Sequence, residues 1–317
     1  MKKLLSILLF AFSLTAWGET FIPLKYGNFD TWVSRDIKES AVVGGKHKTL
    51  WEIGPERRIR GNIPYKNLGG SPWGTSNVLA KVAGVTKGSC AVTPDVRAGH
   101  GKCVKLNTIL ERCKAIGIIN IDVTVAGSIF LGQMIEPVKS TKNPYSKMDM
   151  GIPFTARPKA LQFDYKMVTP SDANRLYSSG FGKKKTLPGA EKAEVYILLQ
   201  RRWEDAEGNI HAKRVGTGRQ HFTGSTSGWV NAHQIPVWYG DITLHPGYKP
   251  FMGLIPKDKS YYARNSRGEM VPVIEEGWDA TDATPTHLMV MASAAEGAPY
   301  IGTIGLTFWL DNIGLVY

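Results

Sequence analysis

The stretch that decides the fold is the last one, Thr286–Tyr317, which reads THLMVMASAAEGAPYIGTIGLTFWLDNIGLVY. Leu288–Ser293 is a nearly continuous apolar run, typical of a strand buried in a β-sandwich. Glu296–Pro299 supplies turn chemistry, because Gly tolerates positive φ and Pro fixes its own φ. A second strand then runs from Thr307 to the end. An apolar last strand needs a sheet to receive it, so we expect it to close a sandwich with strands from the beginning of the chain.

The chain upstream of this pair also reads as strands separated by turn signals. From Ala160 to Val168 every second residue is apolar, which predicts a half-buried strand. Further strands are expected at 78–85, 103–110, 116–130, 195–199 and 235–239. No internal repeat and no long amphipathic helix is evident. The predicted fold class is therefore all-β, a β-sandwich or jelly roll.

The domain organisation follows from length and composition. Residues 19–317 are enough for one large β-sandwich domain, which is the organisation we predict. Two long loops are expected in it, at about 171–193 and at about 244–285. The first contains Lys183-Lys184-Lys185, and the second is rich in proline. Loops of this size in a compact domain are commonly functional or disordered.

The first 18 residues, Met1–Gly18, have the pattern of a secretory signal peptide. Lys2 and Lys3 precede an apolar run, and Ala16-Trp17-Gly18 is a small-x-small cleavage site. No later apolar run is long enough to span a bilayer, so no transmembrane anchor is expected. We predict an exported protein, periplasmic or extracellular, whose mature chain begins at about Glu19.

The charge balance is basic. The chain holds 39 Lys and Arg against 27 Asp and Glu, a net charge of +12. An exported basic protein can bind acidic glycans, anionic lipid headgroups or envelope polymers. The competing interpretation is that the charge is spread over loops and only aids solubility. No nucleic-acid-binding module is recognisable, so nucleic acid is not an expected partner.

Three cysteines, Cys90, Cys103 and Cys113, are an odd number for an oxidising compartment. One disulfide with a remaining thiol, or three buried reduced thiols, both fit this count, and the sequence does not choose a pairing. The spacings match no zinc pattern.

Six pieces of the chain, taken in order, resemble a known family. They are Pro72–Asn77 (PWGTSN), Gly101–Leu106 (GKCVKL), Ala126–Gly132 (AGSIFLG), Gly151–Pro158 (GIPFTARP), Ala193–Ile197 (AEVYI) and His287–Tyr317. The ordered set resembles the putative carbohydrate metabolism domain, a family of exported β-sandwich proteins of gut anaerobes. The resemblance implies a jelly-roll-like sandwich similar to carbohydrate-binding modules, and a carbohydrate partner.

Candidate ligand-binding residues are aromatic side chains in or beside loops. A planar ring matches the apolar C–H face of a pyranose, and polar groups then bind its hydroxyls. One arginine between two prolines is added because it could hold an acidic sugar. The candidates are Trp73, Trp203, Trp278, Tyr261, Tyr262 and Arg157. A purely structural role is the competing interpretation for each of them.

The same resemblance implies one structural calcium ion. Related sandwich modules hold it between an acidic residue near the start and another in the last strand, and hard oxygen ligands suit this ion. Asp30 and Asp311 occupy those places here. The competing interpretation is a surface Asp and a turn-capping Asp.

A catalytic set is not assigned. A glycosidase needs two carboxyl groups roughly 5 Å or roughly 6.5–9.5 Å apart. The acidic residues of the second long loop are Glu275, Glu276, Asp279 and Asp282. Adjacent residues on a strand face opposite ways, which argues against Glu275 with Glu276. A lyase uses Tyr with Arg or Lys, and Tyr261-Tyr262 with Arg264 would fit, as would many loops by chance.

The function that the sequence favours is an exported carbohydrate-binding β-sandwich protein without clear catalytic machinery, whose ligand is an acidic glycan. The first alternative is a polysaccharide-active enzyme, a glycoside hydrolase or lyase. The second is a structural or adhesive envelope component that assembles through the apolar C-terminal strand. The identity of the sugar and the oligomeric state are not determined by the sequence.

Overall fold

The computed structural model describes residues 18–115, 119–171, 174–180, 182–296 and 298–317. These residues form β-strands and short 3₁₀ helices, and the described part of the chain contains no α-helix. The all-β prediction is therefore confirmed. No helix within the described ranges is long and apolar enough to cross a membrane. Apart from Gly18, the predicted signal peptide lies outside the described residues.

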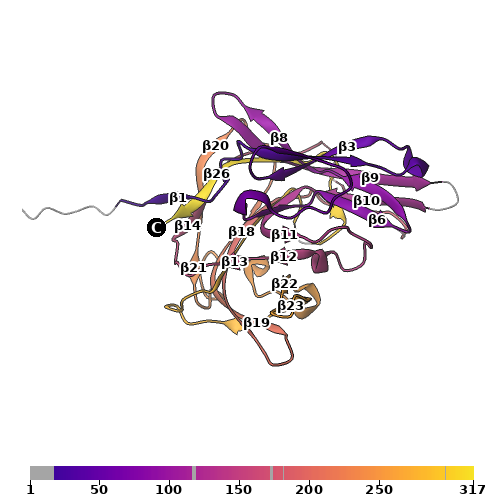
Figure 1. The fold of residues 1–317 in the computed structure, drawn as a ribbon. Helices are drawn as coiled ribbons and strands as arrows, with labels where there is room; N and C mark the ends of the chain where they lie inside the picture. Colours follow the sequence, from indigo (N-terminus) through magenta and orange to yellow (C-terminus); the bar gives the residue numbers. More distant parts are fainter. Residues whose placement is uncertain (1–17, 116–118, 172–173, 181, 297) are drawn as a thin grey trace, which may run out of the picture.

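One of the two large sheets has eight strands, and the C-terminal strand lies inside it (Figure 1). Its strands are β1 (Phe21–Pro23), β8 (Val92–Arg97), β9 (Gly101–Ala115), β10 (Ile119–Ala126), β14 (Ala160–Val168), β16 (Ser179–Gly180), β20 (Val230–Pro236) and β26 (Thr307–Val316). β26 pairs with β14 along one edge and with β9 and β1 along the other. Phe21 lies opposite Val316. The expected closure of the sandwich by the two ends of the chain is confirmed.

The second large sheet has ten strands. They are β5 (Trp73–Thr75), β11 (Ser128–Met134), β12 (Met148–Met150), β13 (Ile152–Pro153), β18 (Ala193–Glu204), β19 (Ile210–Phe222), β21 (Trp238–Tyr239), β22 (Tyr262–Arg264), β23 (Met270–Trp278) and β24 (His287–Ser293). Seven of them close on themselves in the order β11, β24, β18, β19, β23, β22, β12, because β11 pairs with both β24 and β12. We call this the strand ring.

Smaller elements complete the fold. The short sheets contain β2 (Trp32–Lys38), β3 (His47–Ile53), β4 (Arg57–Arg60), β6 (Val78–Val82), β7 (Val85–Ser89), β15 (Arg175–Tyr177), β17 (Lys185–Leu187) and β25 (Ile301–Gly302). The 3₁₀ helices are η1 (Ala41–Val43), η2 (Leu68–Gly70), η3 (Pro144–Lys147), η4 (Pro250–Met252) and η5 (Lys257–Lys259).

The two predicted long loops are only partly irregular. The range 171–193 contains β15, β16 and β17, and the range 244–285 contains β22 and β23. β23 runs parallel to β19 and belongs to the strand ring. Two parallel strands cannot be joined by a tight hairpin, so β23 and β19 are distant in sequence and no turn motif predicts their pairing. The prediction of continuous loops at these places was wrong.

The main core lies between the two large sheets. Phe163 and Leu161 of β14 and Phe308 of β26 meet Val195 and Ile197 of β18 there, all fully buried. The alternation predicted for β14 follows from this arrangement, since its odd-numbered residues point into the core.

The inside of the strand ring holds a second apolar cluster. It consists of Phe130, Met148, Met150, Tyr196, Leu198, Tyr261 and Met289. Tyr196 and Leu198 alternate with the main-core residues of β18, so both faces of this strand are buried. A strand buried on both faces reads as the uninterrupted apolar run seen in the sequence.

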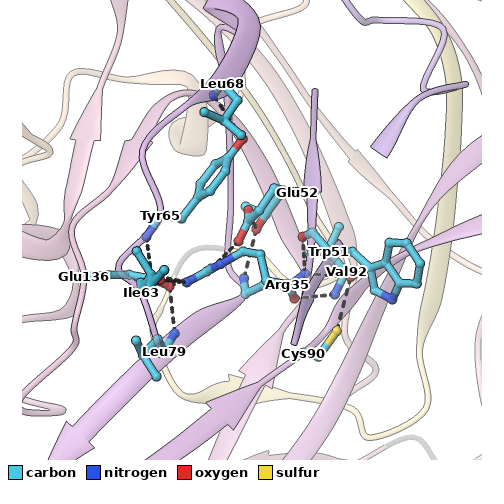
Figure 2. A network of polar contacts seen from close by, with 12 residues as sticks. Arg35, Trp51, Glu52, Ile63, Tyr65, Leu68, Leu79, Cys90, Val92 and Glu136 are labelled. Atoms are coloured by element: carbon cyan, nitrogen blue, oxygen red, sulfur yellow. Dashed lines mark hydrogen bonds and ion pairs between the residues drawn. The ribbon is translucent and has the colours of Figure 1, made fainter. Parts of the chain in front are cut away.

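A sealed polar network ties the N-terminal strands to the main body (Figure 2). Arg35 on β2 donates to Glu52 at 2.7 Å and to Glu136 at 2.5 Å, and all three side chains are buried. Glu136 also accepts the backbone N–H groups of Tyr65 and Leu79. Because the two carboxylates bond to the guanidinium and to backbone N–H groups away from solvent, we assign the network a structural role.

All three cysteines are present as free thiols. Cys103 and Cys113 are buried and Cys90 is half-buried. Burial raises the pKa of Cys90 to about 11 and the pKa of Cys103 to about 12. Thiols with raised pKa values are poor nucleophiles, so neither of these two is suited to covalent catalysis.

Candidate functional site

Two hollows adjoin one another beside the strand ring. The first, which we call the apolar cleft, has a volume of about 280 Å³ and runs between the β6–β7 hairpin, β10, η3 and the end of β24. The second, the basic pocket, is shallow and open. It is lined by Arg175, Lys192, Arg219, His221, Pro250, Phe251 and Glu296. Glu296 lines both hollows.

Strands β18 and β19 position the charged groups of the basic pocket. Their register places Glu194 opposite His221 and Tyr196 opposite Arg219. Glu194 accepts hydrogen bonds from Arg219 Nε at 2.6 Å and from His221 Nε2 at 2.8 Å. The other ring nitrogen of His221 lies 2.7 Å from Glu296, which also pairs with Lys192. The result is a row in which the imidazole of His221 lies between two carboxylates, and each carboxylate also has a cationic partner, Arg219 or Lys192.

The electrostatics of Glu194 follow from this row. Burial alone would raise the pKa of its carboxyl group, but the hydrogen bond from His221 and the charge of Arg219 outweigh burial and hold the pKa below its usual value. Glu194 is therefore a carboxylate at neutral pH, able to accept hydrogen bonds. Glu191, just before β18, behaves oppositely, since burial raises its pKa.

Aromatic rings flank both hollows. Phe251 stacks on His221 with ring centroids 3.8 Å apart and planes 15° apart. Inside the strand ring, Tyr261 stacks on Tyr196 with ring centroids 5.9 Å apart. Its ring also meets that of Tyr145 edge-on, with centroids 5.8 Å apart. Tyr261 and Tyr145 line the apolar cleft. The site thus offers ring faces next to paired charges, which is the combination that carbohydrate recognition uses.

The tryptophan candidates lie apart from this site. Trp73 is fully buried, packs against Phe29 and donates its indole N–H to Lys25 O, so it has no surface to offer a ligand. Trp203 is 39 % exposed and stacks on His211 near the C-terminal end of β18. Trp278 is half-buried beside Arg214. The expectation that turn residues expose Trp73 was wrong.

The remaining ligand candidates divide in the same way. Tyr261 lines the apolar cleft, whereas the hydroxyl of its neighbour Tyr262 accepts a hydrogen bond from Asn143. Arg157 lies over the ring of Tyr239 and donates to two backbone carbonyls. Among the predicted ligand residues, the structure brings Tyr261 to the site and leaves the others elsewhere.

Asp30 and Asp311 do not fit the implied calcium site. Asp311 Oδ2 accepts a hydrogen bond from Arg97 at 2.7 Å, and Arg97 binds Asp164 at the same distance. A guanidinium already occupies the place of a cation. Asp30 instead accepts the backbone N–H of Lys102 at 3.0 Å. Within the described residues, no group of three or more His, Cys, Asp or Glu side chains could hold a metal ion.

The acidic residues considered for catalysis are separated by their partners. Glu275 is buried inside the strand ring, where Arg214 binds it at 2.6 and 2.5 Å and Gln200 donates to it. Glu276 instead pairs with His211, and Asp279 with Arg201. Glu275, Glu276 and Asp279 thus each pair with a different basic residue.

The residues that the sequence did not single out are Lys192, Glu194, Arg219, His221, Phe251 and Glu296. One signal was present. Glu194 is a charged residue within the apolar run AEVYI, and a buried carboxylate requires a partner. The partners come from β19 and from the turn after β24, so only the fold identifies them.

A two-layered all-β fold with a ligand-sized cleft beside one sheet places this chain among the β-sandwich proteins. The chain belongs to the putative carbohydrate metabolism domain family, whose model matches residues 39–224. No curated protein sequence matches the chain.

Two solved structures are similar to it. One is described as a putative glycoside hydrolase from Bacteroides thetaiotaomicron, with 17% identity, a TM-score of 0.45, and coverage of 86% of this chain and 76% of the other. The second is described as a putative glycoside hydrolase from Bacteroides vulgatus, with 13% identity, a TM-score of 0.44, and coverage of 94% and 95%.

Proposed function

We propose that this protein binds an acidic carbohydrate in the basic pocket. The observation that carries the proposal is the stacked pair Phe251 and His221, set among Arg175, Lys192 and Arg219 in a pocket open to solvent. The family to which the chain belongs is carbohydrate-related, which supports the ligand class.

Each part of the pocket has a role in this proposal. The half-buried ring of Phe251 contacts the C–H face of a sugar, while Glu296 accepts hydrogen bonds from hydroxyl groups. Arg175 binds the acidic group of the sugar. Its Nε is buried without a hydrogen-bond partner within the described residues, and a buried N–H of this kind favours a ligand acceptor.

The protein meets this ligand outside the cytoplasm in our proposal. Support comes from the signal-peptide pattern of Met1–Gly18 and from the net charge, which is +10 once Lys2 and Lys3 are removed. A positive chain attracts polyanionic glycans over a distance set by ionic strength.

A second candidate function, glycoside hydrolysis, rests on one observation. Glu194 and Glu296 both line the apolar cleft, and His221 lies between them with one ring nitrogen bonded to each. Two carboxyl groups held apart across a cleft are what an inverting glycosidase requires. Both carboxylates are tied to cations, however, which favours hydrogen-bond acceptance over proton donation.

A glycan array with the purified mature chain, followed by product analysis of every bound glycan, tests both candidates. The binding proposal predicts retention of uronic-acid or sulfated glycans, with the glycan recovered intact. Cleaved products that disappear in Glu194→Gln would establish hydrolysis instead. Absence of binding to acidic and neutral glycans alike would refute the carbohydrate proposal.

A further inference from the structure

The apolar cleft is not explained by sugar binding alone. Its walls are mostly hydrocarbon. On the β6–β7 hairpin, Val78, Ala80 and Val82 occupy every second position and line the cleft. On β10 the same spacing is found for Val123 and Val125. All five side chains remain half-buried rather than packed into a core.

Two apolar surfaces of this kind, the β6–β7 hairpin and β10, would normally pack against each other and exclude water. At one end they do, because Val85 of the hairpin packs with Ile121 and Cys113. Further along they stay apart and leave the cleft of about 280 Å³. Apolar surface kept open to water in this way costs free energy, which a matching ligand would recover.

The cleft also holds a polar feature. Ser89 Oγ and Thr124 Oγ1 line it, are buried, and have no hydrogen-bond partner within the described part of the chain. A buried hydroxyl without a partner is unfavourable, so a polar atom of a ligand or a water molecule is expected there. A ligand that is mainly hydrocarbon but carries some polar atoms suits both observations.

The cleft adjoins the basic pocket at Glu296, which lines both. A molecule whose apolar part lies in the cleft therefore has its polar end beside Lys192, Arg219 and Arg175. These three cations favour a ligand whose polar end is negatively charged.

We propose that the ligand is an anionic amphiphile, a glycan bearing an alkyl or acyl chain. The chain occupies the apolar cleft and the acidic sugar occupies the basic pocket. This inference rests on the proposed function for the sugar half and adds the hydrocarbon half. Its volume places the cleft at the lower end of ligand sites, which suits a single chain.

Calorimetric titration with n-alkyl β-D-glucuronides, from methyl to decyl and below their micelle concentrations, tests the inference. Affinity should rise by up to about fourfold for each added methylene until the cleft is filled, and then level off. Ala80→Phe, which fills the cleft from the hairpin side, should abolish this rise and leave the affinity for the methyl glycoside unchanged. Ala126→Phe should do the same from the opposite wall.

A matched control lies on the same hairpin. Lys81→Phe adds an equal ring to an exposed residue outside the cleft lining and should keep the dependence on chain length. Equal affinity along the series would overturn the inference, even if the methyl glycoside binds. If affinity rises with chain length to the same extent in Phe251→Ala and for alkyl compounds without the sugar, the sugar site is refuted instead.

Discussion

Glu52 and Glu136 share the guanidinium of Arg35, so two carboxylates compete for one buried cation (Figure 2). Burial raises the pKa of Glu52, Arg35 lowers it, and Glu136 raises it again, with the pKa at about 7 as the result. Glu52 therefore changes protonation near neutral pH.

The raised pKa of Glu52 makes the stability of the fold depend on pH. An unperturbed glutamate has a pKa of 4.5, so between about pH 4.5 and about pH 7 the folded protein binds more protons at Glu52 than the unfolded chain does. Stability from this group must then fall as pH rises through that window. Glu52→Gln, which keeps the acceptor for Arg35, should flatten the fall in the free energy of unfolding measured by denaturant titration at pH 5 and pH 7.5.

The exposed Glu56 provides the control, because Glu56→Gln should leave the pH dependence as it is in the native chain. If Glu52→Gln retained the full native slope, the titration would have to be assigned to another group.

At the scale of single residues, the sequence predicted types of side chain better than their places. Aromatic side chains and one arginine were expected at the ligand site, and the proposed site combines an aromatic ring with arginines, but at Phe251, Arg175 and Arg219. Trp73 was expected at the surface because turn residues surround it, but its indole fills the core next to Phe29. Whether a loop aromatic points inward depends on contacts from distant segments, which local composition does not report.

Among the elements, β26 lies at the centre of the first large sheet, where it pairs with β14, β9 and β1. Phe308 on this strand is fully buried and packs against Phe222 at 5.3 Å and Tyr165 at 5.7 Å. Phe308→Ala should lower the free energy of unfolding by about 3–5 kcal/mol, because the lost ring leaves a cavity at the centre of the sandwich.

The neighbouring residue serves as comparison. Trp309 points to the other face, where it is half-buried and bonds to Asp95. Trp309→Ala should cost less, about 1–2 kcal/mol. Equal losses for the two variants in chemical denaturation would contradict the placement of β26 at the core.

The junction of β10 and β11 depends on Gly127. A Cβ at this position would lie 2.4 Å from Ala91 O and 2.6 Å from Asn107 N, both backbone atoms that cannot move aside cheaply. Gly127→Ala should therefore destabilise the protein by about 2 kcal/mol or more, as overpacking does. Gly228→Ala, where nothing lies within 4 Å, should leave the melting temperature unchanged. A neutral Gly127→Ala would show that the strands can separate there.

Strands with period-two patterning were predictable. Of their pairing, the contact between the last strand and the beginning of the chain was predictable. The alternation of β14 and the continuous run of β18 indicated one and two buried faces, respectively. The sequence does not predict the parallel strand β23, because its partner β19 is distant in sequence and no turn chemistry links them. Non-local pairing of this kind leaves no short-range signature.

For the whole molecule, the position of β26 removes the argument on which the envelope-component hypothesis rested. The envelope-component hypothesis required a C-terminal strand with an edge available to another subunit. β26 instead has neighbours on both sides, with β14 on one and β9 and β1 on the other. Assembly through that strand is therefore not expected, and any self-association must use another surface.

The binding proposal is likewise a statement about the whole molecule, because Phe251, His221 and Arg175 come from segments far apart in the chain. The sequence indicated loop aromatics and a basic balance, and among its candidates Trp203 and Trp278 were those whose removal was expected to weaken binding. Trp203 lies near one end of β18, and Glu194, which bonds to His221 of the proposed site, lies near the other, so the two locations make different predictions.

The most direct test compares the affinity of three proteins for the best acidic glycan found on the array, by isothermal titration. Our account predicts that Phe251→Ala weakens binding about tenfold, since an aromatic contact is worth about 1 kcal/mol or somewhat more. Trp203→Ala should stay within about twofold of the native chain. Native affinity in Phe251→Ala together with a large loss in Trp203→Ala would contradict the account and move the site to the β18–β19 tip.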